Sequence, residues 1–317
     1  MNRKAITIGA ILLAALAVAM ILAVLLGAER LSLFDLNEQQ ASILFDIRLP
    51  RILLGACVGA SLAVAGAGLQ SLLRNPLAEP YLLGVSNGAA LGTMLAFVFF
   101  QSLEIMRPLM AFAGAGLATI AVYRMAKSRS GMNVERLVLS GVIVTTFLSS
   151  VIVMLTTLLD AAKLRSFTFW LLGDLSQASW NGVYLSLGAV IVGTVVLISQ
   201  ARALNLMMVG ERDAFDFGVE VGRVRMLVFG AASLVVGAAV AASGSVGYVG
   251  LIVPHLVRLT VGSDNRLVVP FSAIAGAIFV VFADTIARTA IAPRELPVGA
   301  ITALIGAPMF IYLLRRN

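Results

Sequence analysis

Residues 49–73, LPRILLGACVGASLAVAGAGLQSLL, form the stretch that decides the fold. After Arg51 it contains no charged residue, and it is long enough to cross a hydrocarbon core of about 30 Å, which takes about 20 apolar residues of helix. Arg48 and Arg51 stand at the mouth of this run, on either side of Pro50. The pattern predicts a membrane-spanning helix and leaves the two arginines to be explained.

The rest of the chain has the same character. Hydrophobic residues make up 60% of it, charged residues 12%, and the mean hydropathy is +1.00. These values exclude a soluble enzyme. We expect an all-α, polytopic membrane protein with about ten transmembrane helices in a single domain, residues 1–317. The charge-poor segments are 5–27, 49–73, 81–100, 108–126, 137–159, 181–200, 226–243, 246–261, 268–290 and 297–314.

Charge and motifs set the topology and exclude two kinds of function. With the N-terminus inside, fifteen Lys and Arg residues fall on the cytoplasmic side and eight outside, so both termini are predicted to be cytoplasmic. The net charge of +7 then reflects topology and not nucleic acid. No G-x-x-x-x-G-K-[ST] motif occurs, and no loop is long enough for a nucleotide-binding domain, so any ATP is hydrolysed by a partner. We expect no metal and no cofactor.

Five blocks of sequence resemble one family in order along nearly the whole chain. They are RLPRILLGACVGASLAVAGAGLQ (48–70), RNPLAEPYLLGVSNGAALG (74–92), LNLMMVGERDAFDFG (204–218), GYVGLIVPHLVRL (247–259) and ELPVGAITALIGAPMFIYLL (295–314). The chain thereby resembles the FecCD family of ABC importer permeases, which take up iron–siderophore complexes, haem or vitamin B12. The resemblance implies a type II importer in the cytoplasmic (inner) membrane. It also implies a homodimer, or a heterodimer with a sister permease, two ATPase subunits and an extracytoplasmic binding protein.

The longest polar connection on the predicted cytoplasmic side is residues 201–225. Ala214, Phe217, Gly218 and Val221 recur at helical spacing and predict a short amphipathic helix, which either docks in a groove or lies among lipid headgroups. The family resemblance favours docking and identifies the segment as the coupling loop for the ATPase. Phe217 stands where leucine is commoner in the family. The coupling residues so assigned are Leu206, Gly210, Glu211, Ala214, Phe217, Gly218 and Val221.

The stretch RNPLAEP, residues 74–80, breaks helical regularity with Pro76 and Pro80. Such a break is tolerated at membrane depth where it lines a cavity or packs in protein. From the residues alone it is either a plain tight turn or part of a passage. The resemblance implies a cytoplasmic gate at Asn75 and Leu77.

Arg48, Arg51 and Arg288 are three of the arginines on the predicted outer side, where basic residues are least expected. Pro50 suits the first turn of a helix, which would place Arg48 and Arg51 at the positive end of the helix dipole, with Arg288 joining them. They either reach lipid phosphates or bind a partner. The resemblance implies that they dock carboxylates of the binding protein. Asp284, four residues before Arg288, is expected to form a local ion pair.

The sequence therefore predicts a permease subunit that passes an iron chelate, meaning a siderophore or haem complex, or cobalamin, without choosing between them. A self-powered secondary carrier for a small solute is the alternative, although the deep spans hold few of the ionisable residues that mark ion pathways. A membrane anchor for an assembly is the third possibility.

Overall fold

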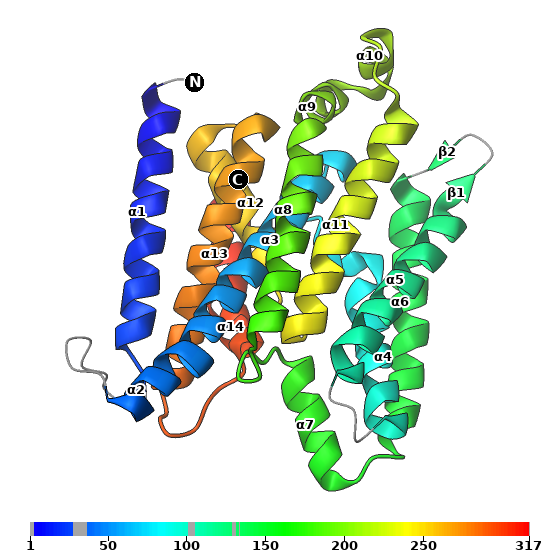
Figure 1. The fold of residues 1–317 in the computed structure, drawn as a ribbon. Helices are drawn as coiled ribbons and strands as arrows, with labels where there is room; N and C mark the ends of the chain where they lie inside the picture. The colour runs from blue at the N-terminus through cyan, green and yellow to red at the C-terminus, as the bar shows by residue number, and fades with distance from the viewer. Residues whose placement is uncertain (1–2, 28–36, 101–104, 129–130, 133, 317) are drawn as a thin grey trace.

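The computed structural model describes residues 3–27, 37–100, 105–128, 131–132 and 134–316 (Figure 1). Fourteen α-helices dominate the described residues, with one π-helical turn, one 3₁₀ turn and one antiparallel pair of two-residue strands. In chain order the elements are α1 (Arg3–Leu25), α2 (Glu38–Ser42), the π-helical η1 (Ile43–Arg48), α3 (Leu49–Leu73), the 3₁₀ turn η2 (Pro80–Leu83), α4 (Val85–Phe99), α5 (Met106–Ala126), β1 (Lys127–Ser128), β2 (Gly131–Met132), α6 (Val134–Thr156), α7 (Ala161–Leu171), α8 (Trp180–Ser199), α9 (Ala201–Val209), α10 (Glu211–Asp216), α11 (Val221–Ser243), α12 (Val249–Val261), α13 (Asn265–Thr289) and α14 (Val298–Arg316).

The all-α membrane architecture predicted from hydropathy is confirmed. Within the described residues, seven helices are long and apolar enough to cross a bilayer, counting α2, η1 and α3 as one continuous helix. Three shorter apolar helices, α4, α12 and α14, complete the predicted set. Each of the ten charge-poor segments of the sequence corresponds to one of these helices.

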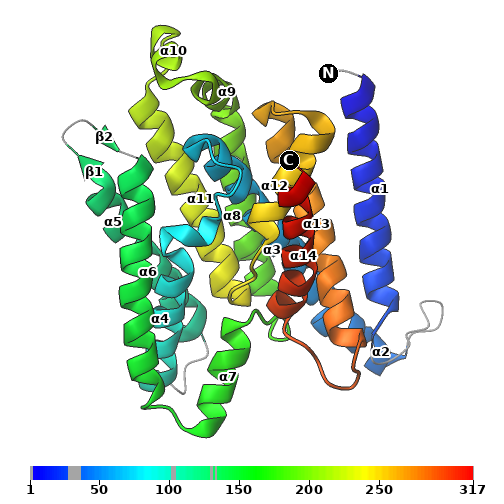
Figure 2. The ribbon, with the colours of Figure 1, turned by 180° about the vertical axis from the view of Figure 1, so that it is seen from behind.

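Helix α3 lies at the centre of the bundle (Figures 1 and 2). Helices α8, α11, α12 and α13 all pack against it, and nearly every residue from Ile52 to Leu72 is buried. A helix that is apolar on all sides suits either lipid or the interior of a protein, and the burial of α3 shows that it lies in the interior. The stretch that decides the fold is therefore its central element.

Close contacts through glycine hold α3 against its neighbours. A Cβ on Gly59 would lie 2.1 Å from the carbonyl oxygen of Gly276 in α13, and one on Gly66 would lie 1.9 Å from that of Gly250 in α12. Helices in lipid associate through such close backbone approach, because lipid tails are as apolar as the helices themselves. Gly59 and Gly66 are therefore positions where no side chain fits.

The helix that contains α3 begins earlier than predicted. It runs without interruption from Glu38 to Leu73, so Pro50 does not open it, contrary to the expectation from sequence. Proline cannot donate the hydrogen bond that an α-helix needs at this position. The π-helical turn η1 accommodates the hydrogen bond that is missing at Pro50. In this turn the Leu49 N–H donates to the Leu44 carbonyl, five residues back. Arg48 and Arg51 lie inside a long helix, without the dipole of a helix end.

The two ends of the bundle carry different short helices. Helices α9 and α10 project at the end toward which both termini lie, and α2 and α7 lie at the opposite end (Figures 1 and 2). Helix α7 and the α2 extension were not predicted from the sequence.

We predict that Gly59→Val lowers the free energy of unfolding by about 1–3 kcal/mol or more, because overpacking here meets backbone and not a flexible side chain. The matched control is Gly230→Val in α11, since a Cβ there has nothing within 4 Å. Thermal unfolding in detergent measures both. Equal melting temperatures for the two variants would contradict the α3–α13 contact.

Candidate functional site

The segment between α8 and α11 folds into two short helices at one end of the molecule. Helix α9 buries Ala201, Leu204 and Met207 on one face, and Leu206 packs partly against the core. Beyond it, α10 stands out from the bundle (Figure 1) and buries Ala214. The segment is therefore fixed to the bundle on one side and open on the other.

The helical face predicted over residues 214–221 does not form. Gly218, with φ of +80°, ends the helical turn, and the Val219 N–H donates to the Ala214 carbonyl at 2.9 Å. This is the hydrogen bond of a Schellman motif, in which glycine takes the left-handed conformation. Ala214 consequently faces the core whereas Phe217 faces outward, and Val221 already begins α11.

Three apolar side chains form an exposed apolar tip on this segment. Val209, Phe215 and Phe217 are 78%, 73% and 75% exposed. They flank or lie within α10, next to charged residues and outside the apolar spans. Large apolar groups exposed together in a polar setting mark a binding surface. Sequence reasoning found Phe217 and missed Val209 and Phe215, although apolar residues inside so charged a segment were the available signal.

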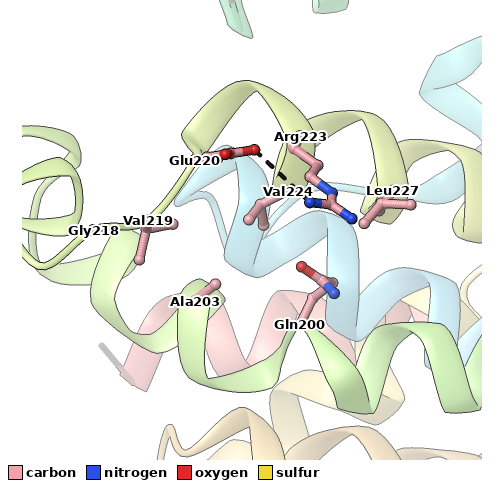
Figure 3. A pocket seen from close by; sticks show the side chains of 8 residues that line it. All are labelled: Gln200, Ala203, Gly218, Val219, Glu220, Arg223, Val224 and Leu227. Atoms are coloured by element: carbon pink, nitrogen blue, oxygen red, sulfur yellow. Dashed lines mark ion pairs between the residues drawn. The ribbon is translucent and has the colours of Figure 1, made fainter.

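A groove of about 440 Å³ lies behind the tip, between the end of α8, α9 and the start of α11 (Figure 3). Glu220 and Arg223 form an ion pair at 4.0 Å on its edge. The groove is lined by Gln200, Ala203, Gly218, Val219, Glu220, Arg223, Val224 and Leu227. It therefore adjoins the exposed tip and extends the surface open to a partner.

Glu211, the first residue of α10, connects the segment to two other helices. Its carboxylate pairs with Arg225 of α11 and lies 3.6 Å from Arg74. Arg74 ends α3 in a left-handed conformation, with φ of +50°, and directly precedes the predicted gate residue Asn75. One carboxylate of the predicted coupling loop thus contacts the residue that leads into the turn.

The turn at 74–80 has its own hydrogen bonds. The Asn75 side-chain oxygen accepts from the Leu77 N–H at 2.8 Å, a local bond that fixes a tight turn. Leu77 is exposed. Glu79 points inward and accepts from the Tyr248 N–H at 3.1 Å, and burial raises the pKa of the Glu79 carboxyl. The turn is held on α12 while Asn75 and Leu77 stay exposed.

Ser71, Asn205, Arg258 and Asn265 make a second connection. Ser71 and Asn265 are buried whereas Asn205 and Arg258 are half-buried, and the four are called the buried polar network below. Asn205 of α9 accepts from the Asn265 side chain at 2.9 Å. Asn265 accepts from the Ser71 hydroxyl at 2.7 Å. Arg258 of α12 donates to Ser71 at 2.7 Å and to Asn265 at 3.2 Å. The network joins α9, α12, α13 and the last turns of α3, and sequence reasoning missed it.

At the opposite end of the molecule, the three predicted arginines come together around Asp284. Arg51 donates to the Asp284 carboxylate at 2.9–3.1 Å and to both Glu295 oxygens at 2.9 Å. Arg288 lies 3.7 Å from Asp284, so the local ion pair that we expected is present. The main partner of Asp284 is nevertheless Arg51, which is 233 residues away in sequence.

The arginines are buried, contrary to the prediction that they face outward. Arg48, Arg51 and Arg288 are 5%, 7% and 6% exposed. Arg48 donates to the Val24 carbonyl at 2.8 Å, and Arg288 donates to a carbonyl at the end of α1. Reversing the charge of Arg51 would set a third carboxylate beside Asp284 and Glu295, so such a variant is not expected to fold normally. A docking role for the cluster stays a prediction.

With this geometry in place, the comparison with known proteins is decisive. Residues 6–316 match the FecCD transport family. The chain belongs to that family. Over 282 residues this FecCD chain is 47% identical to the cobalamin import system permease protein of Halobacterium salinarum, covering 89% of the chain and 76% of the relative. It is 38% identical over 286 residues to the hemin transport system permease protein of Yersinia pestis, covering 89% and 85%.

A solved structure confirms the fold of this FecCD chain. The structure is described as an inward-facing conformation of a putative metal-chelate type ABC transporter. It has a TM-score of 0.88 and 32% identity, covering 96% of this chain and 98% of the solved one. The family resemblance that we drew from five sequence blocks is confirmed, and the FecCD chain is a permease subunit of an ABC importer.

Proposed function

We propose that this permease passes a bulky iron chelate or cobalamin between two protomers, driven by an ATPase that docks on the exposed apolar tip of Val209, Phe215 and Phe217. The names of the relatives support the substrate class, since they specify cobalamin and hemin. The tip carries the proposal, because a chain without an ATP-binding motif exposes two phenylalanines on a polar projection. The importer lies in the cytoplasmic membrane with both termini inside.

The coupling loop transmits movement of the ATPase to the gate by two routes. On the first, Glu211 of α10 pairs with Arg74, which adjoins the gate residues Asn75 and Leu77. On the second, Asn205 of α9 reaches the last turns of α3 through the buried polar network. Since both routes end at the C-terminus of α3, displacement of the loop shifts the turn that carries the gate.

The binding protein docks at the opposite end, above the arginine cluster. Arg51 already holds two carboxylates of its own chain, of which Asp284 is buried and the Glu295 side chain is 45% exposed. The Glu295 carboxylate therefore occupies the outward side of Arg51, where we expect a carboxylate of the partner to bind. Both Glu295 oxygens accept from the same Arg51 nitrogen. Docking of an acidic partner on Arg51 requires Glu295 to give way.

The second protomer is a copy of this chain. Helix α6 is the part of the chain that could face the second protomer or the passage between protomers, because it exposes Thr146 and Ser150, four residues apart on one face. Each hydroxyl bonds a carbonyl of its own helix, at 2.9 and 3.0 Å. Hydroxyl groups on an outward face of a span suit a neighbouring helix or a polar passage better than lipid tails.

Replacing both Phe215 and Phe217 with Asp tests the ATPase site. We expect loss of the co-purifying ATPase, because the complex would bury two unpaired charges at a cost of several kcal/mol. Size-exclusion chromatography of the co-expressed importer measures retention. Phe215→Leu with Phe217→Leu is the matched control and keeps the complex. Full ATPase retention by the Asp variant rejects this docking surface.

Asn205→Ala tests transmission through the buried network. We expect several-fold less substrate moved per ATP hydrolysed in proteoliposomes of the assembled importer. Asn87→Ala is the control, because that amide also joins two helices, donating at 3.0 and 2.6 Å to α6, but lies away from the coupling loop. If both variants lose the same fraction of coupling, the network is structural only.

Glu295→Gln tests docking without disturbing Asp284. Removing the competing carboxylate charge should speed capture of the acidic binding protein, most strongly at low salt, where rim charges act on association rate. Glu38→Gln is the control, an exposed acid of α2 at the same end. The association rate of the binding protein is measured on surface-immobilised importer. An unchanged rate for Glu295→Gln would argue against contact between the binding protein and Arg51.

A further inference from the structure

Helix α1 leaves a groove between itself and the bundle. It packs beside α13 (Figure 1), yet its described residues are buried only near the two ends, at Ala5 and Ala23. Between α1, α12 and α13 a groove of about 720 Å³ remains. A space of this size in a membrane-spanning region must be filled, because its walls would otherwise lose their packing contacts.

The lining of the groove is apolar apart from one end. Its walls come from Lys4–Leu12 of α1, Val253–Thr260 of α12 and Phe271–Phe282 of α13. Hydrocarbon and aromatic groups make up the lining except for the Thr260 hydroxyl and the Lys4 ammonium, which belongs to the first turn of α1. A long apolar slot with a cation at its mouth matches an amphiphile that carries an anionic head.

The dimensions match one leaflet of a bilayer. At about 1.5 Å per residue, the α1 wall is about 12 Å long and the α13 wall about 17 Å, against about 15 Å for half of a 30 Å hydrocarbon core. The first turn of α1, which contains Lys4, lies at the end of the molecule that carries α9 and α10 (Figure 1). The groove therefore spans the leaflet on that side, and its cation lies at the depth of the headgroups.

The single cation at one end of an otherwise apolar groove suits a lipid with an anionic head. A lipid presents its phosphate at the depth of the headgroups, where Lys4 stands in the first turn of α1, and its acyl chain along the apolar walls. We propose that the groove binds an anionic phospholipid of this leaflet, with its acyl chain between α1 and α13 and its phosphate paired with Lys4. The lipid thereby adds to the contact that Ile8 and Leu12 of α1 already make with the bundle.

Tryptophan fluorescence in vesicles with brominated acyl chains tests this assignment, because bromine in contact quenches the indole. Ile11 lines the groove and Leu13 does not, although the two are similarly exposed, at 61% and 57%. The full-length chain carries either Ile11→Trp or Leu13→Trp in brominated phosphatidylcholine. Signal from Trp170 and Trp180 is subtracted with the unsubstituted chain.

Unbrominated phosphatidylglycerol or phosphatidylcholine is then mixed in. We expect phosphatidylglycerol to relieve quenching of Ile11→Trp at a several-fold lower mole fraction than phosphatidylcholine does, and both lipids to relieve Leu13→Trp in proportion to their mole fraction. Adding Lys4→Gln to Ile11→Trp should remove the preference.

Three outcomes overturn the proposal. Equal relief by the two lipids at Ile11→Trp shows a groove without headgroup recognition. A preference that survives Lys4→Gln shows that another group holds the phosphate. Absence of quenching at Ile11→Trp, alongside quenching at Leu13→Trp, shows that a protein segment such as a second copy fills the groove.

Discussion

The contact between α3 and α13 is the constraint on which the rest of the molecule depends. Gly59 and Gly276 let the two backbones meet at mid-length. On one side of that point Arg51 of α3 pairs with Asp284 of α13, and on the other Ser71 pairs with Asn265. The polar contacts at both ends form only because the glycines set the distance between the helices.

The charges around Arg51 and Asp284 are first of all structural. A buried ion pair gives little net stability, but removal of one partner strands the other in a low dielectric, which costs about 3–5 kcal/mol. Asp284 serves both Arg51 and Arg288, and through Arg288 it also reaches the end of α1. Any role of these arginines toward a partner protein is constrained by their place in the fold. A substitution of the half-exposed Glu295 can change the binding of a partner protein while the buried pair of Arg51 and Asp284 stays intact.

Hydropathy predicted the ten spans because each span is a local property of 13 to 25 consecutive residues. The polar segment between α8 and α11 was likewise visible in the sequence. Local pattern failed where a distant partner decides the outcome. The burial of Arg51 depends on Asp284, 233 residues away, and the continuation of the helix through Pro50 depends on a shifted hydrogen-bond register. The face predicted over 214–221 failed because Gly218, counted as a small helical residue, instead takes a positive φ.

The uninterrupted helix from Glu38 to Leu73 has 36 residues, about 54 Å at 1.5 Å per residue, well beyond the thickness of the hydrocarbon core. It is therefore long enough to reach both surfaces of the membrane, and its backbone contact with α13 at Gly59 divides it into two arms. The arm toward Glu38 is about 32 Å and the arm toward Leu73 about 21 Å. A tilt of about 5° moves these ends by about 3 Å and about 2 Å in opposite directions. Rocking of this one helix about Gly59 would therefore move the two faces of the permease in opposite directions.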